Sequence, residues 1–408
     1  MSSSVPRRTV RWPGHALPAE DADGDVGVAL HAHPANNFDS LRLLAAGMVL
    51  CSHQFALTGR PEPRVLGLMK LGTFGVLVFF VISGYLVAQS WDRDPHPLRF
   101  AAKRLLRIWP GLAVVTCVAA WLLGPLVTDA SLRDYFHSPV TWDYFAQLVF
   151  AVRLHLPGVF EHSPYPAVNG SLWTIPIEVQ WYGALLLAGV CGWLRPHMRF
   201  FLLTLVLLYV SYLYLIYDVQ HNPNARFLAP DFGIEYGSFF CYGALLYLFQ
   251  GTWFRHPLRL FLGLIMLAGV LLACHQGYAC LYMVLPFVVI RVGTWSTPVL
   301  RRFGRYGDFS YGMYIYAFMI QQWLTWLMGP GHPYWLGLLA SMLCTLVCAV
   351  LSWHLVERPA LNLKRRLPGA TLPAGDIPDI WQEHVLSKDT LPPVRTGEQL
   401  VSPGNKDS

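Results

Sequence analysis

Apolar stretches long enough to cross a lipid bilayer recur along most of this 408-residue chain. A membrane-spanning helix needs about 20 consecutive, mainly apolar residues. Hydrophobic residues make up 54% of the sequence and charged residues only 13%, against roughly 25% charged in an ordinary globular protein. This balance excludes a disordered chain, a disulfide-linked secreted domain and a nucleic-acid-binding protein. We predict an all-α integral membrane protein, a polytopic bundle of about ten transmembrane helices at residues 38–57, 72–91, 110–127, 174–192, 200–217, 232–250, 259–275, 279–292, 311–328 and 334–356.

The distribution of basic residues predicts how these segments are oriented, because cytoplasmic loops carry an excess of Lys and Arg. With the N-terminus inside, the inner loops and tail residues up to position 366 hold 20 Lys and Arg residues, and the outer loops hold six. The sequence therefore predicts a multi-pass protein with both termini in the cytoplasm and membrane lipids around its bundle.

Three regions lie outside the predicted helical core. Residues 1–37 contain three Arg, four Pro and no apolar run, which predicts a flexible cytoplasmic tail without a cleavable signal peptide. Residues 128–173 form the largest predicted outer loop, long enough to cover the bundle. Residues 367–408 are rich in polar residues and Pro, and we expect a disordered cytoplasmic tail.

Ionisable residues inside apolar helices are costly, and the first predicted helix contains two of them, Arg42 and His53. Eleven residues separate them, which is about 20° past three full helical turns, so both side chains share one face about 16 Å apart along the axis. A functional pair is one interpretation. Alternatively, Arg42 extends to the inner interface beside Asp39, and His53 is a hydrogen-bonded core residue.

Glu178 adds a carboxylate to the fourth predicted helix, about one turn from its outer end. That helix runs from outside to inside, which gives Glu178 a depth similar to that of His53. We predict an acid–base or orienting pair of Glu178 and His53. The alternative is a buried hydrogen bond with a structural role only.

Four basic residues, Arg99, Lys103, Arg104 and Arg107, lie between the second and third predicted helices. Helical spacing brings Lys103, Arg104 and Arg107 onto one patch, which suits the binding of phosphate groups. The general excess of positive charge on the cytoplasmic side explains the same residues without a ligand.

Six motifs in fixed order carry a resemblance to a known family. The chain resembles acyltransferase family 3, integral-membrane O-acyltransferases of bacterial surface polysaccharides, lipid-linked sugars and some small molecules. The resemblance covers about residues 36–366 and implies a bacterial inner-membrane enzyme without an appended soluble catalytic domain. The motifs are FDSLRLLAAGMVLCSH, GVLVFFVISGYL, KRLLRIWP, NGSLWTIPIEVQWY, FSYGMYIYAFMIQQ and HLVERP.

The resemblance implies functional roles for residues that match these motifs. Many family members have a histidine where this chain has Ala317, so a second catalytic histidine is excluded there. Ser83 to Tyr85 could instead serve only close helix packing. Tyr311 and Tyr314 could instead belong to an aromatic belt at the membrane interface. The residues with implied roles are Arg42, His53, Ser83, Gly84, Tyr85, Arg104, Arg107, Glu178, Tyr311 and Tyr314.

The implied reaction transfers an acyl group, most simply acetyl, from acyl-CoA to a hydroxyl of a sugar, polysaccharide or lipid-linked saccharide. Arg104 and Arg107 would hold the donor's phosphates, and His53 would act as base or carry the acyl group transiently. No permanent cofactor is expected, and the absence of a CxxC pair gives no indication of a metal. The competing interpretation is a transporter or flippase for a lipid-linked saccharide, against which stands the lack of half-chain repeats.

Overall fold

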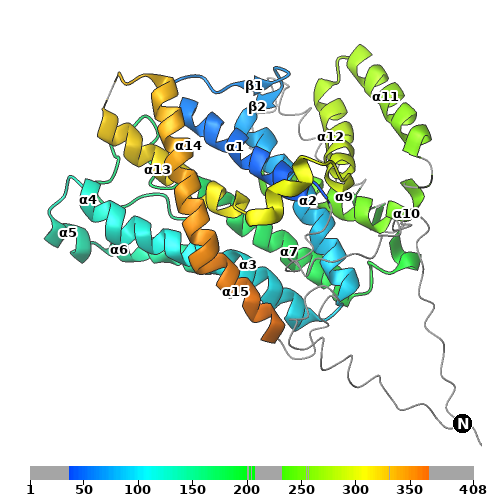
Figure 1. The fold of residues 1–408 in the computed structure, drawn as a ribbon, viewed down its shortest axis with the longest axis horizontal. Helices are drawn as coiled ribbons and strands as arrows, with labels where there is room; N and C mark the ends of the chain where they lie inside the picture. Colours follow the sequence, from blue (N-terminus) through cyan, green and yellow to red (C-terminus); the bar gives the residue numbers. More distant parts are fainter. Residues whose placement is uncertain are drawn as a thin grey trace, which may run out of the picture. The chain divides into compact units, whose positions relative to one another are not determined.

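Helices form nearly all the regular structure in the part of the chain that the structure describes (Figure 1). Within hydrocarbon a backbone must satisfy its own hydrogen bonds, and a helix does so within one segment. The computed structural model describes residues 36–199, 202–203, 205–206, 232–253, 255, 257–329 and 331–366, which belong to one compact unit. The longer helices are α1 (Phe38–Leu57), α2 (Leu71–Arg93), α3 (Pro97–Cys117), α7 (Thr174–Val190), α9 (Phe232–Leu248), α11 (Pro257–Ala273), α12 (Gly277–Thr294), α13 (Ser310–Met328) and α14 (Tyr334–Ser352).

Short elements connect or extend these helices. Two two-residue strands, β1 (Arg64–Val65) and β2 (Met69–Lys70), pair antiparallel between α1 and α2. The remaining elements are η1 (Val118–Leu123), α4 (Gly124–Val127), α5 (Leu132–His137), α6 (Pro139–Asp143), η2 (Tyr144–Val149), η3 (Gly170–Trp173), η4 (Pro196–Met198), α10 (Gln250–Trp253), η5 (Leu300–Tyr306), η6 (Trp353–Glu357), α15 (Arg358–Asn362) and η7 (Leu363–Arg366).

The all-α membrane architecture predicted from the sequence is confirmed. Helices lie at nine of the ten predicted spans, and the span at 200–217 falls mostly outside the described residues. The count of ten stays a prediction, and both predicted tails lie almost entirely outside the described residues. In the described part, five helical stretches are long and apolar enough to cross a membrane: Phe38–Leu57, Leu71–Arg93, Pro97–Val127, Gly277–Thr294 and Tyr334–Asn362.

The third predicted span began too late. Helix α3 begins at Pro97 and continues through η1 and α4 to Val127, whereas the apolar pattern indicated a start near residue 110. Proline suits the first turn of a helix, where no backbone N–H is needed. The basic residues after Pro97 hide the helix from a search for apolar runs. Arg104 and Arg107 therefore lie on α3 itself, one turn apart on one face.

Helix α2 lies at the centre of the packing and contacts α9 and α1 extensively. The α2–α9 contact brings the two backbones together through glycine. A Cβ atom added to Gly84 would lie 1.9 Å from the carbonyl oxygen of Phe240, and one added to Gly243 would lie 2.1 Å from that of Val81. Only glycine permits this approach, which is typical of membrane helix interfaces. The packing interpretation therefore holds for Gly84.

Two long helices contain a π-helical segment, η1 after α3 and η6 after α14. In such a segment the backbone hydrogen bonds join residues five apart instead of four, so the helix is wider there and some backbone groups lose their usual hydrogen-bond partner. At η1 the hydroxyl of Tyr135 donates to the carbonyl of Ala120 at 2.8 Å. At η6 the segment ends on Glu357, a carboxylate that is only 2% exposed.

Candidate functional site

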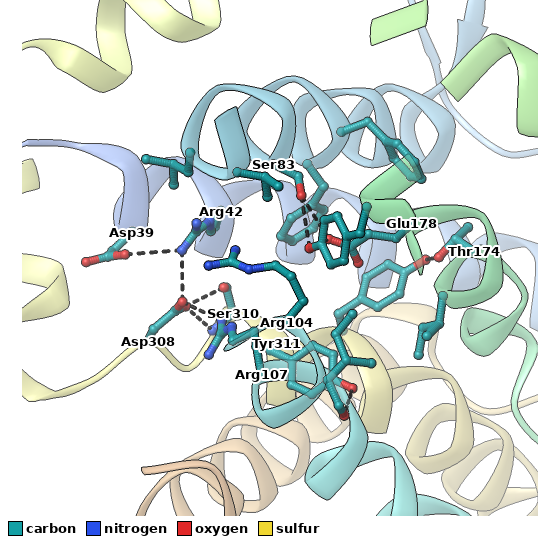
Figure 2. A pocket seen from close by; sticks show the side chains of 18 of the residues that line it. Asp39, Arg42, Ser83, Arg104, Arg107, Thr174, Glu178, Asp308, Ser310 and Tyr311 are labelled. Carbon is teal, nitrogen blue, oxygen red and sulfur yellow. Dashed lines mark hydrogen bonds and ion pairs between the residues drawn. The ribbon is translucent and has the colours of Figure 1, made fainter. Parts of the chain in front are cut away.

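A cavity of about 390 Å³ opens among α1, α2, α3, α7, α13 and the α15–η7 segment. We call it the cationic cavity. Figure 2 shows Arg42, Arg104, Arg107 and Asp308 gathered on one side of it and Ser83, Glu178 and Thr174 on the other. Its charged lining residues are Arg42, Arg104, Arg107, Lys364, Asp39, Glu178 and Asp308.

Asp308 links two of these arginines. Its Oδ2 atom accepts from Nη1 of Arg42 at 2.9 Å and from Nη2 of Arg107 at 2.5 Å. Arg42 also pairs with Asp39 at 3.5 Å, and Arg107 faces Glu357 at 3.6 Å. Burial alone would raise the pKa of the Asp308 carboxyl, but Arg107 and Arg42 outweigh burial and hold this pKa well below its usual range. The two arginines are thus fixed in position by carboxylates.

Arg104 differs from its neighbours because it forms no ion pair with any described residue. Its Nη2 atom lies 3.3 Å from the hydroxyl of Ser90, and its buried Nε–H has no hydrogen-bond partner. The guanidinium carbon lies 5.9 Å from the ring centroids of both Phe100 and Tyr182. A buried charge normally has a partner. Arg104 therefore keeps an unused Nε–H donor in the wall of the cavity, where an anion would be its partner.

Glu178 belongs to the same cavity and to a small hydrogen-bond cluster. Its Oε1 atom accepts from Ser83 Oγ at 3.0 Å and from the hydroxyl of Tyr182, and these two hydroxyls lie 3.1 Å apart. Helix α2 supplies Ser83 and α7 supplies the other two residues. Ser83 therefore contacts the site directly rather than serving helix packing alone.

Two tyrosines of α13 line the cavity between these groups. The hydroxyl of Tyr311 donates to the carbonyl of Ile108 at 2.6 Å, and Arg107 lies 5.5 Å above its ring centroid. Tyr314 shares a hydrogen bond of 2.6 Å with Thr174. Both rings face the protein interior at this site, which does not fit an aromatic belt in lipid headgroups.

His53 does not line the cationic cavity. Its ring lies edge-on to Phe318 with centroids 5.0 Å apart, and its buried Nδ1 atom has no hydrogen-bond partner. The neighbouring Ser52 donates to Glu62 at 2.6 Å. The predicted pair of His53 with Glu178 is not formed here, because Glu178 instead bonds Ser83 and Tyr182.

Two further predicted residues lie away from the cavity. Lys103 pairs with Asp94 at 2.6 Å, and Arg99 pairs with the same carboxylate, whose pKa is held well below its usual range mainly by that Arg99 contact. Tyr85 is 3% exposed, and its hydroxyl donates to Gln250 at 3.2 Å. Lys103 is thus held by an ion pair and Tyr85 by a hydrogen bond, neither lines the cavity, and a role of either in donor binding stays a prediction.

The comparisons with known proteins identify the family. A family model described as an acyltransferase domain, that of acyltransferase family 3, matches residues 36–354. The chain belongs to acyltransferase family 3. This membership confirms the resemblance read from the six motifs, and it makes the protein a membrane O-acyltransferase of the O-acetyltransferase type.

Three relatives of this family 3 acyltransferase cover most of its length. An "O-acetyl transferase" of Shigella phage Sf6 is 30% identical over 338 residues, 81% of this chain and 97% of the relative. "Nodulation protein 10" of Rhizobium leguminosarum bv. viciae is 28% identical over 366 residues, 81% of this chain and 95% of the relative. "Putative membrane-bound transacylase BcsY" of Komagataeibacter xylinus is 24% identical over 82% of this chain and 85% of the relative. No solved structure matches.

Sequence reasoning missed three charged residues of the candidate site, Asp308 and Lys364 in the cavity lining and Glu357 beside Arg107. Lys364 lines the cavity, where burial and then the nearby Arg104, Arg107 and Lys103 lower its pKa to about 7. Each of the three follows or precedes a predicted span, so each resembled an ordinary loop or interface residue. The motif HLVERP contains Glu357 and was the only signal for it.

Proposed function

We propose that the protein moves an acetyl group from acetyl-CoA to a hydroxyl of a saccharide acceptor. The single observation that carries the donor part is Arg104, a buried cation with unused donors in a cavity that already holds Arg42, Arg107 and Lys364. Coenzyme A has several phosphate groups, and guanidinium groups bind phosphates through paired hydrogen bonds.

The donor would lie with its phosphates at Arg104 and Lys364 and its arm directed along α1 toward His53. Arg42 and His53 lie about 16 Å apart along the helix axis, a distance that a long flexible arm can cover. The Glu178 carboxylate, oriented by Ser83 and Tyr182, would accept from an amide N–H of that arm. The excess of basic residues predicts that this end of the bundle faces the cytoplasm, where coenzyme A is found.

His53 would serve as the base. As the acceptor hydroxyl attacks the thioester carbonyl, a C–O bond forms, the C–S bond breaks, and the hydroxyl proton passes to His53. His53 then returns the proton to the departing thiolate of coenzyme A. The unpartnered, buried Nδ1 atom of His53 supports this role, since no neighbour competes for that position.

The saccharide acceptor is supported by the family's likeness and by the name of the phage relative, an O-acetyl transferase. The family assignment also supports acyl transfer over the transporter or flippase alternative. We further propose a bacterial inner-membrane location with both termini in the cytoplasm, on the basis of the distribution of Lys and Arg.

Native membranes that contain the protein provide the test. Incubation with acetyl-CoA labelled on the acetyl group should label saccharides in the membranes, and membranes without the protein should stay unlabelled. Movement of lipid-linked saccharide across the membrane without labelling would contradict the proposal and favour a flippase.

A further inference from the structure

A second cavity, of about 560 Å³, lies at the other end of α1 from Arg42. We call it the loop cavity, because loops at the ends of α1, α4 and α13 form most of its wall. Figure 1 shows the ends of α1 and α13 on the same side of the bundle as α4 and α5. The volume lies within the range of about 300–1,000 Å³ that is typical of small-molecule sites. Neither the family nor the relatives' names assign a role to it.

Its lining contains polar atoms without partners. Thr325 and His332 line the cavity, and each has a buried atom, Thr325 Oγ1 and His332 Nε2, without a hydrogen-bond partner among the described residues. Buried polar atoms normally have a partner in the protein or a bound molecule. Trp326 lies beside them with 49% of its side chain exposed. Hydrogen-bonding atoms beside an aromatic ring suit a ligand with many hydroxyls and an apolar ring face.

One side of the cavity is held firmly in place. Gln322 is 1% exposed, donates to the carbonyls of Tyr165 and Ala167 at 2.6 and 2.8 Å, and accepts from Ser163 at 3.0 Å. These bonds tie the segment before α7 to the end of α13. The cavity wall is therefore preorganised, which lowers the entropic cost of binding a ligand.

Charge distinguishes the two cavities. The cationic cavity has four Arg and Lys residues against three carboxylates. Among the described residues that line the loop cavity, the charged ones are Arg60, Asp129 and Glu161. A donor with several phosphates therefore suits the cationic cavity, and a ligand without phosphate suits the loop cavity.

His53 lies in the layer between the two cavities. Along α13, Tyr314 lines the cationic cavity and Gln322 lines the loop cavity, with Phe318 midway between them. Four residues of helix span about 6 Å, and His53 contacts Phe318 at 5.0 Å. One turn after His53, Leu57 lines the loop cavity. A hydroxyl at the floor of the loop cavity is thus about one helical turn from the base.

We propose that the loop cavity binds the saccharide acceptor and directs one hydroxyl past Phe318 to His53, while the acyl donor occupies the cationic cavity. The proposal rests on the proposed function and adds that donor and acceptor enter from opposite ends of the bundle. Thr325 and His332 supply hydrogen bonds to the saccharide, and Trp326 packs on its ring.

Two measurements on full-length protein test this assignment. Native membranes with labelled acetyl-CoA report transfer to saccharide, and calorimetry with coenzyme A alone on the purified protein reports the donor site. The Thr325→Val, Trp326→Leu double variant should lower saccharide labelling at least tenfold and keep the affinity for coenzyme A. Trp335→Leu is the matched control, because Trp335 is 73% exposed on α14 outside the cavity, and it should change neither measurement.

A chemical block keeps the test independent of how well the double variant folds. The His162→Cys variant should label saccharide until a charged, membrane-impermeant methanethiosulfonate reagent is added at the loop-cavity face, because His162 is exposed and lines that cavity. The reagent should then stop labelling, without effect on wild-type protein treated in the same way.

The outcomes separate the two proposals. Unlabelled saccharide in wild-type membranes would contradict the proposed function itself. Wild-type labelling by the double variant, loss of its coenzyme A affinity, or full labelling after complete modification of His162→Cys would each overturn the assignment of the loop cavity and leave the donor site standing.

Discussion

Replacement of Arg104 by lysine tests whether its free guanidinium group binds the donor's phosphates. The substitution keeps the positive charge, so the orientation of the chain in the membrane should not change. It removes the Nε–H donor, which has no partner in the protein, and the planar pair of N–H groups. Hydrogen bonds to charged groups contribute about 1.5–3 kcal/mol each. Loss of one such bond should therefore weaken coenzyme A binding by about tenfold to a hundredfold.

The assay compares two donors on purified protein in nanodiscs. Acetyl-CoA should show the loss, whereas S-acetyl-pantetheine, which lacks the nucleotide phosphates, should show none. Arg302→Lys is the matched control, because Arg302 is exposed and does not line the cavity. Equal loss on both donors, or no loss on either, would refute the assignment of Arg104 to the donor phosphates.

Three further predictions concern the same site. His53→Ala should lower acyl transfer by about 10²–10⁴-fold while the protein still accumulates. The control His275→Ala should leave acyl transfer unchanged. If His53→Ala kept a tenth of wild-type turnover, His53 would not be the base. Asp308→Asn takes the shared carboxylate away from two partly buried arginines, so thermal unfolding should show a loss of up to about 3–5 kcal/mol, and unchanged stability would contradict the network. Lys364, with its pKa lowered to about 7, is mostly charged at pH 6 and mostly neutral at pH 8. Donor affinity should therefore fall as pH rises through 7 in wild type and not in Lys364→Arg, and parallel pH profiles would exclude a phosphate contact.

The helices were predictable because a membrane-spanning helix needs a long, mainly apolar run of residues, which is easily recognised in a sequence. Hydropathy failed at the start of α3, where basic residues that face a cavity interrupt an otherwise continuous helix. A search for apolar runs cannot distinguish such residues from a loop.

The sequence indicated several of the charged residues at the candidate site, but it did not indicate which of them would contact one another. Depth along a helix placed Glu178 level with His53, but depth leaves the direction around the helix axis free, and α7 turns Glu178 toward Ser83. Asp308 was missed for a related reason. It lies in a connection between helices, and only the packing of three distant segments brings it to Arg42 and Arg107.

The π-helical segment η6 fixes how many residues the chain needs between α14 and the cavity wall. One extra residue in a helical turn rotates everything beyond it by about 100°. Removal of one residue from Trp353–Glu357 would restore regular α-helical winding and swing the stretch after Glu357, with Lys364, to another side of the bundle. Deletion of one residue from α14 would also rotate the stretch after Glu357 by about 100°. Insertion of one residue within η6 would reverse that rotation. Relatives that keep Lys364 at the cavity should therefore conserve the number of residues between α14 and η7 more strictly than the residues themselves.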